Sequence, residues 1–187
     1  MKVLLTGFEP YGQEQVNSSW EAVKAYAESV GGVEIVKECL PVSFERAGMA
    51  LAKTVDLHQP DVVLSVGQAC GRCEINVERV AVNLADSKNA DNDGCQPCER
   101  RLFPDAPDAY FSNLPVKCLV DAIRKAGIPA VVSNSAGLYV CNSVFYTAMH
   151  LVYTKYPNMQ VGFIHVPSTA AKTAVQALKI VIQTLVS

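Results

Sequence analysis

The sequence predicts an α/β protein: a three-layer α/β/α sandwich with a mostly parallel, twisted sheet, an inserted β-hairpin and a long loop. Two observations lead to this prediction. Short apolar, β-branched runs alternate with longer stretches in which apolar side chains recur at helical spacing. Short loops join these segments, and strands separated by helices form parallel sheets that helices cover on both faces. No linker-like stretch divides the chain, so we expect residues 1–187 to form one domain.

The first third of the chain shows this alternation most clearly. Ser18 to Glu21 fits a capping box, in which a serine opens a helix and a glutamate three residues later bonds back to it. Gly31 and Gly32 interrupt the chain after this helix, and Pro60 follows the end of the next one. The predicted elements here are strands at 2–6, 33–40 and 61–66 and helices at 18–29 and 43–57.

The pattern changes after residue 73. Residues 74–85 alternate apolar and polar side chains, but the phase slips at Glu78-Arg79, which we interpret as a β-bulge in a hairpin. Residues 86–107 are polar and rich in turn formers, and such a long loop in a compact domain is often functional. The elements predicted after this loop are a helix at 114–126, a strand at 129–133, a helix that follows Cys141, a strand at 161–166 and a helix at 169–186.

Composition argues against several classes of function. The formal net charge is −2 and 50% of the residues are hydrophobic, which disfavours a nucleic-acid partner or a basic membrane-binding surface. No apolar run approaches the roughly 20 residues that span a bilayer, and the N-terminal residues read as a first strand rather than a signal peptide. Seven cysteines cannot all pair internally, so we expect reduced thiols in the cytoplasm.

Cys141 stands where a predicted strand ends and a helix begins. Residues 129–133 have the composition of a buried parallel strand, and the apolar residues after Cys141 recur at helical spacing. Asn142 and Ser143 can cap that helix. A helix N-terminus offers unpaired N–H groups and the positive end of a dipole, which stabilise a thiolate and can hold an oxyanion. The position suits a nucleophile, and a small core residue is the alternative.

His165 is the histidine best placed to act on this thiol. It lies at the C-terminal end of the last predicted strand, at the sheet edge where open α/β sheets bind ligands, and we expect Cys141 at the same edge. His58 lies at a helix end, whereas His150 lies nine residues after Cys141 and too far along the same helix. A thiol needs a base, and the base needs a group that orients it, for which Glu78 is the candidate.

Eight segments in a fixed order carry a family resemblance over nearly the whole chain. They are LLTGFEPYG (4–12), VGQACGR (66–72), ERVAVN (78–83), DNDG (91–94), AYFSNLPVK (109–117), GIPA (127–130), SAGLYVCN (135–142) and GFIHVP (162–167). With these segments the chain resembles pyroglutamyl peptidase type I, a family of cytosolic cysteine peptidases also called pyrrolidone-carboxyl peptidases.

The resemblance implies a thiol-dependent omega peptidase that removes N-terminal pyroglutamate from peptides through an acyl-enzyme. Cys141 would be the nucleophile, His165 the base and Glu78 the third member of the triad. The family fold is a single α/β/α sandwich without cofactor or metal, and its members are often homodimers or homotetramers. The implied partners are peptides with an N-terminal pyroglutamate.

The resemblance also implies a pocket for the pyroglutamyl ring. This ring is small, flat and uncharged, so its pocket should be apolar and aromatic with a few hydrogen-bonding groups. By resemblance the substrate-binding side chains are Phe8, Tyr11, Asn17, Gln68, Tyr139 and Val140. Asn17 and Gln68 could bond the lactam or the scissile peptide, and capping of loop backbone is the alternative. Arg72 and Arg79 could assist electrostatically or form structural ion pairs.

Four features depart from the family pattern. Asn89 stands where an apolar pocket residue is usual, Leu138 replaces a commoner Thr, Cys70 replaces a Gly, and the segment after His165 is short. We expect Asn89 to make the pocket wetter or to weaken binding of the ring.

The cysteines also suggest a different function. Cys70 and Cys73, together with Cys95 and Cys98, form two CxxC pairs, a spacing close to that of a four-thiolate zinc site. These thiols could bind zinc, form disulfides or stay free. The alternative to the peptidase is therefore a zinc-binding, non-catalytic binding module on the same fold.

Overall fold

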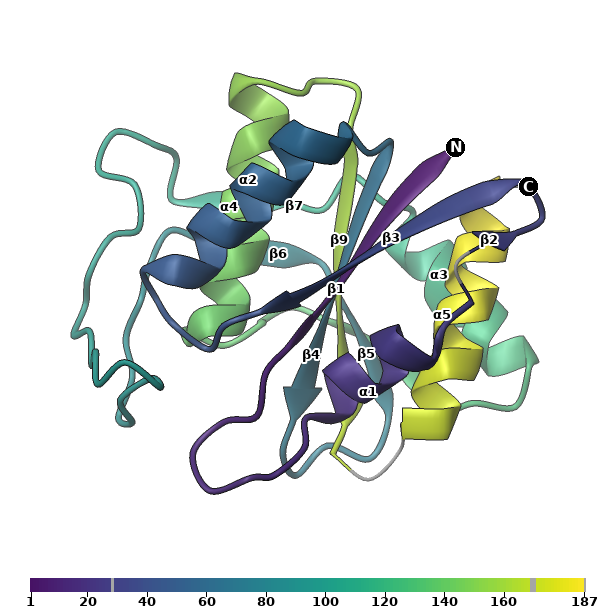
Figure 1. Ribbon diagram of the computed structural model, residues 1–187, viewed down its shortest axis with the longest axis horizontal. Coiled ribbons are helices and arrows are strands. Elements are labelled where there is room, and N and C mark those ends of the chain that lie inside the picture. The colour runs from purple at the N-terminus through teal and green to yellow at the C-terminus, as the bar shows by residue number, and fades with distance from the viewer. Residues whose placement is uncertain (28, 169–170, 187) are drawn as a thin grey trace.

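The computed structural model describes residues 1–27, 29–168 and 171–186 and has the predicted α/β/α architecture (Figure 1). Within these residues, one mixed seven-stranded sheet runs through the molecule. Its strands, in spatial order, are β2 (Ser29–Val30), β3 (Val33–Leu40), β1 (Lys2–Phe8), β4 (Val62–Ala69), β9 (Gln160–Pro167), β5 (Ile75–Glu78) and β8 (Ala130–Ser133). The predicted sandwich is confirmed, and the first two residues of the helix predicted at 169–186 lie outside the described part.

The centre of the sheet is parallel, but one margin runs the other way. Strands β3, β1, β4 and β9 pair in parallel, and Gly67 of β4 lies beside His165 of β9. Strand β5 is antiparallel to β9, and β8 is parallel to β5. The strand predicted at 129–133 therefore lies at the sheet margin and is parallel only to β5. Its apolar run gave no sign of this reversal, because composition does not encode strand direction.

Two helical layers cover the sheet. Helices α1 (Ser18–Ala25), α3 (Val116–Lys125) and α5 (Ala171–Val186) lie on one face, and α2 (Arg46–His58) and α4 (Val140–Thr154) lie on the other (Figure 1). Successive strand residues point to opposite faces, so Leu4 joins the core under α2 and α4 while Leu5 joins the core under α1, α3 and α5. Burial on both faces explains the continuous apolar runs that predicted parallel strands.

The inserted hairpin is built from other strands than those predicted. Strand β6 (Val80–Val82) pairs with β7 (Ala109–Phe111) in a separate antiparallel sheet, and residues 83–108 form the long loop between them. The bulge interpretation at Glu78-Arg79 is wrong. The phase slip marks the point where the chain leaves the main sheet, because Val77 belongs to one apolar core and Ala81 to the other.

The first helix is shorter than the predicted span of 18–29. It ends at Ala25, and Tyr26 adopts an extended conformation. Residues Ser29–Val30 instead pair antiparallel with the start of β3. Strand pairing therefore determines the conformation of residues that were predicted to be helical. None of the described helices is long and apolar enough to cross a membrane.

Gly7 provides a test of how closely α1 packs on the sheet. A Cβ at this position would lie 2.7 Å from Trp20 Cα and 2.8 Å from Trp20 N, both backbone atoms of α1. Gly7→Ala should therefore lower the free energy of unfolding by about 1–3 kcal/mol, measured by urea denaturation, because the helix must shift outward. Lys24→Ala, at an exposed site on the same helix, should change it by less than about 0.5 kcal/mol. An unchanged free energy of unfolding in Gly7→Ala would contradict this prediction and show that α1 can shift outward without destabilising the fold.

Candidate active site

A cavity of about 160 Å³ opens at the carboxyl ends of β1 and β4. Its lining side chains are Phe8, Tyr11, Asn17, Val42, Gln68, Cys70, Tyr139, Val140 and Cys141. The structure thus brings together all six residues that the sequence proposed for substrate binding, and it adds Val42 and Cys70. Nothing in the local sequence pattern distinguishes Val42 from other apolar residues, since the fold alone carries it to this wall.

The thiol of Cys141 lies over the sheet next to β9. Cys141 is the second residue of α4, and its Sγ would be 2.9 Å from a Cβ placed on Gly67. Gly67 is the neighbour of His165 across the β4–β9 pairing. A side chain at position 67 would occupy the space of the thiol, so Gly67 is a site residue that the sequence reasoning missed.

His165 and Glu78 form a buried pair. His165 Nδ1 lies 2.8 Å from Glu78 Oε1, and the two residues are 5% and 0% exposed. The strand pairing explains their meeting, because Asn76 lies opposite His165 and Glu78 follows two residues later on the same face of β5. Arg72 Nη1 lies 3.2 Å from the same Oε1, whereas the buried Oε2 has no hydrogen-bond partner among the described residues.

Asn142 fixes the start of α4. Its buried side chain accepts a hydrogen bond from Val82 N at 2.9 Å and donates to the carbonyl oxygens of Val82 and Leu84 at 2.9 and 3.0 Å. The sequence suggested a helix cap, but the helix already begins at Val140 and Asn142 lies within its first turn. The amide instead joins α4 to β6 and so sets the position of the adjacent Cys141.

Burial of the Cys141 thiol opposes its ionisation. Burial raises the pKa of Cys141 to about 12, and the negative charge of Glu78 acts in the same direction. A hydrogen bond from the backbone N–H of Cys141 itself lowers the pKa by less. The raised pKa favours the protonated thiol, so its direction runs against the expected thiolate at the helix N-terminus. A proton acceptor is needed before this sulfur can attack.

The first turn of α4 still offers N–H groups to a bound oxygen. The first intrahelical bond runs from Ser143 N to Tyr139 O at 3.2 Å. The amides of Val140, Cys141 and Asn142 come before it, so they have no acceptor within the helix. These groups and the positive end of the dipole lie beside the thiol, where an oxyanion would form.

Aromatic rings form one wall of the cavity. Tyr139 packs edge to face against Tyr11 and Phe44, with ring centroids 5.3 and 5.1 Å apart. Its hydroxyl donates a hydrogen bond to Ala90 O at 3.0 Å, which connects the wall to the long loop. Burial raises the pKa of Tyr139, so its hydroxyl remains a neutral donor.

The two amide side chains in the cavity are largely engaged by the protein. Asn17 Oδ1 accepts from the backbone and side chain of Ser19, and its Nδ2 donates to Glu9 O. Gln68 Oε1 accepts from Ser18 N at 2.7 Å, and its Nε2 lies 3.9 Å from Cys70 Sγ. These contacts favour the capping alternative for Asn17. Gln68 Nε2 is left as the better-placed donor for a ligand.

Asp91 anchors the long loop, a role that the sequence reasoning did not assign. Its carboxylate accepts hydrogen bonds from the backbone N–H groups of Phe44, Asp93 and Cys95 at 2.7, 3.0 and 2.8 Å. The DNDG turn was the available signal. Asn89, two residues earlier, is exposed and is not among the described residues that line the cavity, so its effect on binding of the ring stays a prediction.

In the described part of the chain the paired cysteines are not arranged as a metal site. All four thiols are free, and Cys70, Cys73 and Cys98 are exposed. Across residues 1–27, 29–168 and 171–186, no group of three or more His, Cys, Asp or Glu side chains could hold a metal ion. The structure therefore gives no support to the zinc-binding module.

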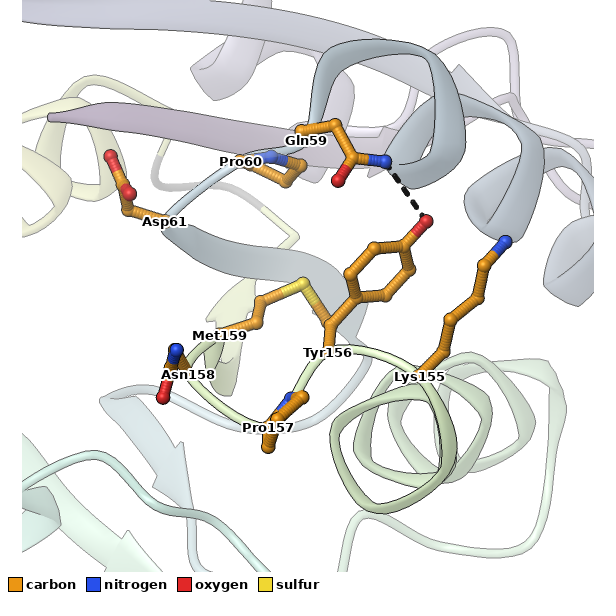
Figure 2. A pocket seen from close by; sticks show the side chains of 8 residues that line it. All are labelled: Gln59, Pro60, Asp61, Lys155, Tyr156, Pro157, Asn158 and Met159. Carbon is orange, nitrogen blue, oxygen red and sulfur yellow. Dashed lines mark hydrogen bonds between the residues drawn. The ribbon is translucent and has the colours of Figure 1, made fainter.

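A larger hollow of about 290 Å³ lies at the opposite end of the sheet, where β4 and β9 begin. Figure 2 shows its side chains, among them Gln59, whose amide donates to the Tyr156 hydroxyl at 3.0 Å. Lys155 beside it pairs with Asp56 at 2.8 Å. The described residues that line this hollow include no cysteine or histidine, so the smaller cavity at Cys141 is the candidate active site.

An α/β sandwich with a cysteine in a pocket, beside the strands that carry a buried histidine–carboxylate pair, has the parts of a cysteine hydrolase. The profile of the family described as pyroglutamyl peptidase matches residues 1–186. The chain belongs to the pyroglutamyl peptidase family.

Individual relatives agree with this assignment. A pyrrolidone-carboxylate peptidase from Thermococcus onnurineus (strain NA1) is 45% identical over 196 residues, covering 98% of this chain and 98% of the relative. One from Thermosipho africanus (strain TCF52B) is 49% identical over 167 residues, covering 89% and 82%. The crystal structure of pyroglutamyl peptidase I from Bacillus amyloliquefaciens has a TM-score of 0.94 at 42% identity, covering 98% of this chain and 93% of that one.

The hydrogen bonds of Asn142 predict a large stability effect. Asn142→Ala should lower the free energy of unfolding by about 2–4 kcal/mol, because three partly buried backbone groups lose their partner. Urea denaturation measures this change. Asn158→Ala, at an exposed asparagine, is the control and should stay within about 0.5 kcal/mol of wild type. Equal effects of the two substitutions would contradict the role given to Asn142.

The raised pKa of Cys141 predicts a protonated thiol in the free protein. Ultraviolet absorbance of thiolates, measured on wild type minus Cys141→Ala, should show no contribution from Cys141 between about pH 6 and about pH 9. Thiolate absorbance should appear only as the pH rises toward 12. A thiolate signal already present near neutral pH would mean that the Cys141 sulfur and His165 form an ion pair at rest.

Proposed function

We propose that this protein removes the N-terminal pyroglutamyl residue from peptides, with Cys141 as nucleophile, His165 as general base and acid, and Glu78 as the group that orients the histidine. The observation that carries the proposal is the 2.8 Å contact of His165 Nδ1 with Glu78, beside a pocket that contains the Cys141 thiol. Membership of the pyroglutamyl peptidase family supports the same reaction.

Glu78 selects the tautomer of His165 that can act as a base. Because the carboxylate accepts a hydrogen bond from Nδ1–H, the imidazole proton resides on Nδ1 and Nε2 keeps its lone pair. Nε2 then accepts the thiol proton of Cys141 as the sulfur attacks the carbonyl carbon of the pyroglutamyl residue. Because the proton leaves the sulfur during the attack, the reaction does not require a thiolate in the free protein and is compatible with the raised pKa of Cys141.

The reaction then proceeds by acylation and deacylation, each through a tetrahedral intermediate. Formation of the C–S bond moves the carbonyl π electrons onto oxygen, where the N–H groups at the start of α4 hold the negative charge. The C–N bond breaks as the imidazolium of His165 gives its proton to the departing amine. A water molecule, deprotonated by His165, attacks the thioester, and the proton returns to sulfur as pyroglutamate leaves.

The lining of the cavity supports a small uncharged ring as the ligand. The rings of Phe8, Tyr11 and Tyr139 offer flat apolar surface, and Gln68 Nε2 is a donor for the lactam carbonyl. No aspartate or glutamate is among the described residues that line the pocket. A free N-terminal ammonium would therefore lose its hydration without gaining a counter-charge, which disfavours ordinary peptide N-termini.

Three further expectations accompany this proposal. The continuous sheet from β2 to β8 supports the expectation that the chain forms one domain. Assembly as a homodimer or homotetramer and a cytoplasmic location stay predictions.

Removal of the thiol is the direct test. Cys141→Ala should lower kcat on a pyroglutamyl-coumarin substrate by at least about 1,000-fold, because no other group of the triad can form the thioester. Cys118→Ala, at an exposed thiol of α3, is the matched control and should keep wild-type rates. Release of coumarin, followed by fluorescence, measures both. A Cys141→Ala variant as active as wild type would refute the assignment.

A further inference from the structure

We propose that Arg72 is a positioning residue that keeps the Glu78–His165 pair in its working protonation state, an inference that rests on the proposed function. From the sequence, Arg72 and Arg79 were equivalent candidates for electrostatic help. The structure separates them, because Arg72 contacts the carboxylate of Glu78 whereas Arg79 lines another hollow with Phe111 and Pro115.

The contacts of Arg72 converge on the side chain that orients the histidine. Its Nη1 lies 3.2 Å from Glu78 Oε1, and its Nη2 donates to Ser135 O at 3.4 Å. The same Oε1 lies 2.8 Å from His165 Nδ1, so one carboxylate oxygen bridges a guanidinium and an imidazole. Glu78 itself is fully buried. A buried carboxylate that loses its cationic partner is strongly destabilised in the charged form.

Three ionisable groups face Glu78 from three separate elements. Arg72 comes from the turn between β4 and β5, His165 from β9 and Cys141 from α4, where the charge of Glu78 raises the pKa of the thiol. Of these three, Arg72 carries a permanent positive charge. The arginine therefore supplies a fixed potential, whereas the other two groups exchange protons during the reaction.

That potential opposes the binding of an extra proton by the pair. The working state has an ionised Glu78 and a neutral His165 with its proton on Nδ1. An added proton produces either an imidazolium or a carboxylic acid that reverses the tautomer, and in both cases Nε2 can no longer accept from Cys141. A cation 3.2 Å from the carboxylate disfavours both protonated forms and so extends activity to lower pH.

The pH profile of kcat/KM tests this role. In Arg72→Gln the midpoint of the acidic limb of this profile should rise by about one pH unit. This is the lower end of the usual pKa shift caused by an adjacent charge, because the Arg72 side chain is 35% exposed and solvent screens its charge. Activity below the limb should fall about tenfold, activity at high pH should approach wild type, and KM should change less than about twofold. Arg72→Lys keeps the charge and should restore most of the profile.

Arg79→Gln is the matched control, since its side chain lies in the other hollow, and its profile should superimpose on wild type. A uniform loss at every pH in Arg72→Gln, or no loss at all, would overturn the inference in favour of a structural role or none. A substitution that merely loosened the fold would not move the limb while leaving the high-pH rate intact.

Proton NMR of the His165 Nδ1–H separates this inference from the proposed function. The midpoint at which this resonance titrates should rise by about one pH unit in Arg72→Gln, and it can be followed whether or not the protein cleaves a substrate. A wild-type protein that leaves pyroglutamyl-coumarin intact would refute the proposed function. An unchanged midpoint in Arg72→Gln would refute the role of Arg72.

Discussion

The hydrogen bond between His165 and Glu78 depends on a reversal in the sheet. β9 belongs to the parallel centre, and β5 runs against it, so the two side chains approach from strands of opposite direction. A parallel β5 would place its carboxyl end at the same edge as that of β9, and its side chains would meet those of β9 in a different register. The antiparallel margin of the sheet therefore has a chemical consequence as well as a topological one.

The charge state of Cys141 results from two opposing effects. The helix N-terminus and its N–H groups favour negative charge, whereas burial and the nearby carboxylate of Glu78 disfavour it. Burial is the largest cause of the raised pKa of this thiol. In the proposed reaction the dipole and the N–H groups of the first turn of α4 act on a different charge, the oxyanion on the substrate. The two charges would arise in sequence rather than together.

Much of this molecule could be predicted from its sequence. Helix period and β-branched runs located the strands and helices of the sandwich, and motif order placed Glu78, Cys141 and His165, which the fold brings to one region. Strand direction at the margin could not be predicted, since Val131 and Val132 are equally suited to either direction. Burial of the thiol is likewise a property of the assembled layers and not of the residues near Cys141 in sequence.

Three residues whose contacts the sequence did not indicate share a different feature. Gly67, Asn142 and Arg72 act through partners 60 or more residues away, or across a turn, and their local patterns look like ordinary strand, cap and surface. Such contacts depend on tertiary geometry, which periodicity and spacing do not report. By contrast, Asp91 lies in a recognisable turn, where its carboxylate accepts hydrogen bonds from the N–H groups of Asp93 and Cys95 in the same loop.

The bond from the Tyr139 hydroxyl to Ala90 O has a consequence for affinity. It holds the aromatic wall and the long loop together before any peptide arrives. A peptide that binds in such a preorganised cavity loses its own conformational entropy, but no further entropy is lost in ordering a flexible loop of the protein. Recognition of so small a ring, which offers few atoms for contact, benefits most from a receptor that is rigid in advance.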